Sequence, residues 1–187
     1  MAVMDTLRLP SLAHERLADA VQAVMTSDPR RAQWLAEGAA ASAAHGAEDL
    51  AARRFQTVLE LGYLVASADG FAASEREQLA RLLASMTGAA LPPAVLEQHF
   101  RDLDQAVALL GRRERLARVA ADIEGPEAAA DAITVAALIA FADGELAAPE
   151  LSALYELGAF VGLSDERVRA LANGLADRLR RHMEATP

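Results

Sequence analysis

Two short stretches of the chain repeat one pattern, an apolar segment that runs into Ala-Asp-Gly. The first is Leu64–Gly70 and the second is Leu138–Gly144. A glycine directly after an apolar helix is typical of the left-handed residue that ends a helix. Asp69 and Asp143 are therefore expected at the carbonyl-rich ends of two helices. The repetition predicts two related halves, each with one carboxylate at the same kind of corner.

These predicted corners place both aspartates where a negative charge is unfavourable. An exposed acid at a helix C-terminus costs roughly 0.3–1 kcal/mol, because the helix dipole is negative there. A bound cation would compensate, since carboxylates and unpaired backbone carbonyls are hard oxygen ligands. The candidate metal ligands are the two corner aspartates and the glutamates of the following turns: Asp69, Glu75, Asp143, Glu145 and Glu150. Calcium or magnesium is expected in preference to zinc, because the chain has no cysteine and its four histidines are scattered.

A plainer interpretation of the same corners needs no ligand. Asp-Gly is a common turn pair, and an aspartate side chain can accept backbone N–H groups from the next turn. The two aspartates would then only shape helix-to-helix corners. An EF-hand is excluded, because its earlier ligand positions would fall on Ile139 and Phe141, which cannot coordinate a metal.

The composition predicts an all-α protein. Hydrophobic residues make up 53% of the chain but aromatic residues only 4%, and alanine, the best helix former, is the commonest residue. The spacing of apolar residues predicts a compact bundle of eight to nine helices with two pseudo-symmetric halves and no convincing strand. Helices over residues 48–68 and 128–142 are apolar on nearly all sides, so they are expected at the centre.

An alanine-rich stretch, Gly38–Gly46, marks the expected boundary between two parts of the chain. Residues 1–48 are predicted to form an N-terminal helical arm that packs on the core. Residues 49–187 are predicted to form the main helical domain, with repeats over about 49–123 and 127–187.

Charge and composition exclude several functions. The net charge is −9, which repels a phosphate backbone, so no nucleic-acid partner is expected. Without cysteine or lysine the chain has no thiol nucleophile, Schiff-base lysine or P-loop lysine. No apolar run is long enough for membrane insertion and no signal peptide is apparent, which predicts a cytoplasmic protein. Arginine clusters at 112–115 and 178–181 are interpreted as solvated helix faces rather than anion-binding sites.

Around its two corners the chain resembles the TerB-like tellurite-resistance family, whose domain is also related to the N-terminal part of DjlA-type co-chaperones. The matching segments are Ala68–Gly70 with Glu75, Ala142–Glu145 with Glu150, and Gly158–Ser164. The resemblance covers about residues 49–180. It implies a compact all-helical domain with pseudo-twofold halves, whose acidic corners lie near one another. It also implies a role in metal-linked stress response, through cation binding or partner recruitment rather than catalysis.

Three functional hypotheses follow from these observations. The leading one is a non-enzymatic TerB-like module, associated with stress or tellurite resistance, that binds a divalent cation or a protein partner through its acidic corners. The second is a metal-free helical interaction scaffold, which docks through its N-terminal helices or its arginine-rich C-terminal helix. The third is a metal-assisted hydrolase, which would have little but the corner carboxylates for its chemistry. Self-association remains an open alternative to a different protein partner.

Overall fold

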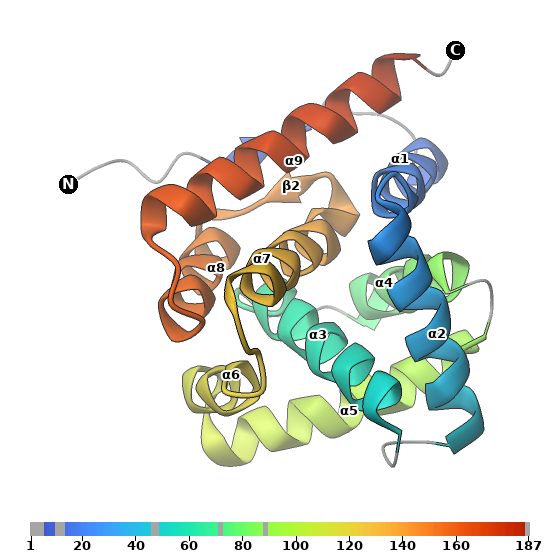
Figure 1. Cartoon of the computed structure of the whole chain (residues 1–187), viewed down its shortest axis with the longest axis vertical. Helices are drawn as coiled ribbons and strands as arrows, with labels where there is room; N and C mark the ends of the chain where they lie inside the picture. Colours follow the sequence, from blue (N-terminus) through green and yellow to red (C-terminus); the bar gives the residue numbers. More distant parts are fainter. Residues whose placement is uncertain (1–5, 10–13, 46–48, 71–72, 88–89, 186–187) are drawn as a thin grey trace.

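The computed structural model describes residues 6–9, 14–45, 49–70, 73–87 and 90–185, and helices dominate it (Figure 1). Nine α-helices occur within these residues, which confirms the predicted all-α class. None of them is both long enough and apolar enough to cross a membrane. The helices are α1 (His14–Thr26), α2 (Pro29–His45), α3 (Leu50–Ala66), α4 (Ala73–Met86), α5 (Pro93–Leu110), α6 (Arg112–Ala120), α7 (Pro126–Ala140), α8 (Ala148–Phe160) and α9 (Asp165–Ala185).

Helices α3 and α7 pack against each other at the centre of the molecule. The second half of α3 and most of α7 are buried on every side, as the apolar sequence of each segment predicts. Their approach is close where Gly62 faces Ile139. A Cβ atom at Gly62 would lie 2.3 Å from Ile139 Cδ1, so the contact depends on the missing side chain.

The other helices surround this central pair. Helix α4 packs on α5, α6 lies against α3 and α8, and α9 covers α7 and α8 (Figure 1). In each half a central helix leads through a corner into a second helix, α3 into α4 and α7 into α8. The fold therefore places the two Ala-Asp-Gly segments at equivalent points of the two halves.

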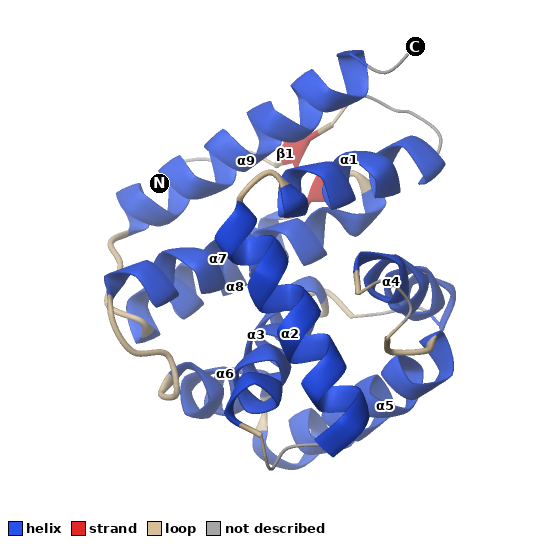
Figure 2. Cartoon of the chain, turned by 45° about the vertical axis from the view of Figure 1, so that its right-hand side comes forward, coloured by secondary structure: helices blue, strands red, loops and turns tan. Residues whose placement is uncertain are grey.

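The first two helices belong to the same packed body. Helix α1 packs on α9, and α2 lies over α3 (Figure 2). Met25 and Leu35 of these helices are buried. Gly38 lets α2 and α3 approach, because a Cβ there would lie 2.5 Å from Phe55 Cβ. The predicted boundary near residue 48 falls beside residues 46–48, which are outside the described part of the chain, so the division into arm and domain stays a prediction.

Two short strands lie among the helices. β1 (Leu7–Arg8) pairs antiparallel with β2 (Glu145–Leu146), so that Arg8 stands opposite Glu145. The Leu9 N–H also donates to the Gly144 carbonyl at 2.9 Å. The sequence analysis did not predict this short pairing, because a two-residue strand leaves no alternating pattern in the sequence. The pairing brings the N-terminal segment to the second acidic corner.

Candidate functional site

The first corner follows α3 and ends in a left-handed glycine. The Ser67 N–H donates to the Tyr63 carbonyl at 2.9 Å, and the Gly70 N–H donates to the Ser67 carbonyl at 3.1 Å. Gly70 has φ +96°, a conformation that favours glycine over any residue with a Cβ. The predicted role of this glycine is confirmed. Asp69, directly before it, is exposed at the end of the turn.

The second corner is the short 3-10 turn Phe141–Asp143, followed by Gly144. The Gly144 N–H donates to the Phe141 carbonyl at 2.9 Å, and Gly144 has φ +94°. Asp143 is exposed, and its Oδ1 accepts the N–H of Glu145 at 2.9 Å. This hydrogen bond stabilises the turn. The ligand-free interpretation predicts this structural role for Asp143.

Glu150 is buried, with only 6% of its surface exposed. It lies in the first turn of α8, and its Oε2 accepts the Ala147 N–H at 2.7 Å as a helix cap. Burial is the main reason why the pKa of Glu150 is raised to about 8, and the hydrogen bond from the backbone opposes this rise. The negative charges of Asp143, Asp69 and Glu145 raise the pKa of Glu150 in the same direction as burial.

Glu150 therefore experiences the charges of both corners. Asp69 comes from the first corner, whereas Asp143 and Glu145 come from the second. Acids of both corners thus act on the pKa of one buried glutamate. Glu150 is buried and subject to these negative charges, and either a bound proton or a cation on it relieves the repulsion.

Glu145 already takes part in an ion pair at this place. The Nε of Arg8 lies 3.1 Å from Oε2 of Glu145, across the β1–β2 pairing. Arg8 is a site residue that the sequence analysis missed, because no sequence pattern indicates a contact between residues so far apart along the chain. Glu75, the remaining predicted ligand, lies in the first turn of α4, and its side chain is outside the described part of the structure.

The carboxylates are not arranged as a ready-made metal cage. Among the described residues, no three Asp, Glu, His or Cys side chains are grouped closely enough to hold a metal ion. The donor chemistry nevertheless fits calcium or magnesium, because every candidate ligand is a carboxylate. The metal site at Asp69, Asp143, Glu145, Glu150 and Glu75 therefore stays a prediction.

A polar network that the sequence analysis did not predict supports the first corner. The Tyr63 hydroxyl of α3 donates to Asp104 Oδ1 of α5 at 2.6 Å, and Arg76 of α4 lies 2.8 Å from the other oxygen of Asp104. Tyr63 is buried and stacks on Phe100, with 4.6 Å between ring centroids. Burial, followed by the hydrogen bond to Asp104, raises the pKa of Tyr63. The network fixes the helices on either side of the corner.

The fold and the site together define an all-helical module of two helix-corner-helix halves, with an exposed aspartate at each corner and a buried glutamate at the start of α8. The family model of tellurite resistance protein TerB matches residues 55–173, more than half of the chain. The chain belongs to the TerB family. Comparisons with curated proteins and with solved structures found no match. Helices α1 and α2 and the C-terminal half of α9 lie outside the matched residues.

Proposed function

We propose that this chain is a non-enzymatic TerB-like binding module, serving tellurite resistance or a related stress response, whose acidic corners bind a divalent cation. The observation that carries the proposal is the position of Glu150, where burial coincides with negative charge from both corners. Burying the charged form of Glu150 without a positive counterpart is unfavourable, so a cation would stabilise its carboxylate.

The predicted ligands divide between the two halves of the fold. Asp69 belongs to the first corner, Asp143 and Glu145 belong to the second, and Glu75 and Glu150 start the helices that follow. A divalent cation would supply charge neutralisation for these acids. Calcium and magnesium suit them best, because both prefer oxygen ligands. Binding would then hold the corners of the two halves together.

A calorimetric titration of the full chain with calcium, magnesium, manganese and zinc tests this proposal. The test variant is Asp69→Asn with Asp143→Asn, because the amide oxygen introduced at position 143 can still accept the N–H of Glu145 and keep the turn. The matched control is Asp122→Asn with Glu124→Gln, two exposed acids away from the corners. We expect saturable binding by the wild type and the control, and affinity weakened roughly tenfold or more in the test variant. Equal heats in all three proteins, or no heat at all, would contradict cation binding.

The metal-free interaction scaffold is the second candidate. It is favoured by the absence of a preassembled group of three ligands among the described residues. The contacts of Glu145 with Arg8 and of Asp143 with the backbone also favour it. In this alternative the exposed carboxylates would meet a positively charged protein surface. The absence of any cation heat in the same titration would leave the scaffold as the better proposal.

A further inference from the structure

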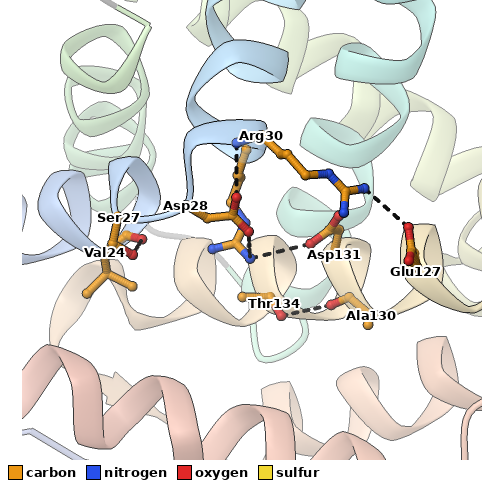
Figure 3. A network of polar contacts seen from close by, with 9 residues as sticks. Val24, Ser27, Asp28, Arg30, Glu127, Ala130, Asp131 and Thr134 are labelled. Carbon is orange, nitrogen blue, oxygen red and sulfur yellow. Dashed lines mark hydrogen bonds and ion pairs between the residues drawn. The ribbon is translucent and has the colours of Figure 1, made fainter.

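Arg31 is held in the interior between the first turn of α2 and helix α7. Its side chain is only 9% exposed. Its Nη2 lies 3.3 Å from Asp131 Oδ1 and 3.8 Å from Asp28 Oδ2. Figure 3 shows the polar network around Asp28 and Asp131. In it the neighbouring Arg30 donates from Nη2 to Oε2 of Glu127, at 3.2 Å. The ion pairs fix the start of α2 against α7.

Two nitrogens of the same guanidinium have no partner. Nε and Nη1 of Arg31 are buried, and no group in the described part of the chain accepts their hydrogens. Burying an N–H donor without an acceptor is unfavourable, and unpaired buried donors are often a sign of a water or an ion that completes the site. Because this donor is cationic, an anion is the stronger partner of the two.

Arg178 belongs to α9, the helix that packs on α7, and Asp131 of α7 is the partner of Arg31. Arg178 is partly buried, and among the described residues it has no carboxylate partner. Burial, together with the positive charges of Arg31 and Arg181, lowers the pKa of Arg178. Other partly buried arginines each pair with a carboxylate: Arg76 with Asp104, Arg112 with Glu156 and Arg115 with Glu60.

Arg181 extends the cluster along α9. It lies three residues after Arg178, and residues at this spacing are neighbours on a helix surface. Arg181 is exposed, so it gives the cluster a side open to solvent. The N-terminus of α2 adds the positive end of a helix dipole beside Arg31.

We propose that Arg31, Arg178 and Arg181 form a binding site for a small phosphate-type oxyanion between the start of α2 and helix α9. Asp28 and Asp131 both pair with Nη2 of Arg31, so its Nε and Nη1 are left as donors for the anion. Guanidinium groups present paired N–H donors that match the oxygens of phosphate. For Arg178, which is partly buried, this proposal replaces the interpretation of residues 178–181 as only a solvated face.

None of the residues of this site belongs to the acidic corners. Arg31, Arg178 and Arg181 all lie outside the residues 55–173 that match the TerB family model. The anion would connect an N-terminal helix to the last helix, so its binding should also stabilise the fold against heat. A failure of the cation proposal would leave this inference unaffected.

Titration of the full chain with orthophosphate at constant ionic strength tests the site, with NMR signals of the arginine Nε–H groups as the readout. Glycerol phosphate in a parallel titration shows whether an esterified anion binds as well as the free one, and acetate serves as the singly charged comparison. The test variants are Arg178→Gln and Arg181→Gln, which leave the ion pairs of Arg31 intact. Arg167→Gln, an exposed arginine on the same helix, is the matched control.

We expect saturable binding of phosphate by the wild type and by the Arg167→Gln control, and a higher thermal midpoint in phosphate than in acetate. Arg178→Gln should bind roughly tenfold more weakly, because it loses a charge-assisted hydrogen bond. A wild type that binds neither phosphate nor glycerol phosphate, or an Arg178→Gln variant as tight as the wild type, would overturn the proposal.

Discussion

At the scale of single residues, burial distinguishes Glu150 from the other predicted ligands. Sequence spacing predicted Asp69, Glu75, Asp143, Glu145 and Glu150 as one set of ligands. In the structure, the charges of Asp69, Asp143 and Glu145 all raise the pKa of Glu150. Spacing could not show that Glu150 is buried, because its burial depends on helices distant in sequence that pack around α8. The buried Arg31 was missed for the same reason.

Replacing Glu150 by glutamine should remove a pH dependence of stability. The folded chain keeps the Glu150 proton up to about pH 8, whereas the unfolded chain loses it near 4.5. The folded state therefore binds more protons between these values, and wild-type stability falls there by up to ~1.4 kcal/mol per pH unit. Glu150→Gln keeps an oxygen for the Ala147 N–H but has no proton to lose.

Urea unfolding at several pH values measures this effect. The variant and the wild type should have similar unfolding free energies near pH 4.5. The advantage of the variant should then grow as the pH rises, and become constant above about pH 8. Glu124→Gln, at an exposed position, is the control and should follow the wild type. An unfolding free energy whose pH dependence is the same in Glu150→Gln and the wild type would disprove the raised pKa of Glu150.

At the scale of elements, helical periodicity predicted the helices and the two central segments well. The apolar pattern is strong there because α3 and α7 are buried on all sides. It failed for β1 and β2, whose two-residue length carries no pattern. It also could not show which helix faces meet. At two places a glycine permits the close contact between helices, Gly62 between α3 and α7 and Gly38 between α2 and α3.

Adding a methyl group at Gly38 should therefore separate α2 from α3. The new Cβ would lie 2.5 Å from Phe55 Cβ and 3.2 Å from the Ala51 carbonyl oxygen, so neither helix can yield by a simple side-chain rotation. We expect Gly38→Ala to lower the free energy of unfolding by about 1–3 kcal/mol. Gly174→Ala in α9 is the control, because no atom lies within 4 Å of its new Cβ. It should raise stability by roughly 0.5–1 kcal/mol, since alanine favours a helix over glycine. Two variants of equal stability would contradict the close contact.

At the scale of the whole molecule, the N-terminal helices and the family-matched region share one hydrophobic core. Val21 of α1 and Leu35 of α2 belong to the same buried cluster as Leu64 of α3 and Leu138 of α7. An arm that packs in this way contributes to the stability of the domain. Because the two parts share this core, we expect them to unfold together.

The single tryptophan offers a direct test of this cooperativity. Trp34 lies in α2, and its ring centroid is 6.1 Å from that of Phe55 in α3. In chemical denaturation, Trp34 fluorescence should report the detachment of the arm, whereas circular dichroism reports all the helices. We expect the two transitions to have the same midpoint and slope, because the shared core makes unfolding two-state. A fluorescence midpoint at lower denaturant would show that the arm detaches as a separate unit.

The pairing of β1 with β2 has a practical consequence for protein production. Leu7 and Arg8 lie beside Glu145, so an affinity tag fused ahead of Met1 would begin only six residues from the acidic corner. Six extended residues span at most about 20 Å. A histidine tag there can bring its own metal-binding imidazoles to the carboxylates and imitate a cation site. Binding measurements on the corners should therefore use a tag that is cleaved off or placed after α9.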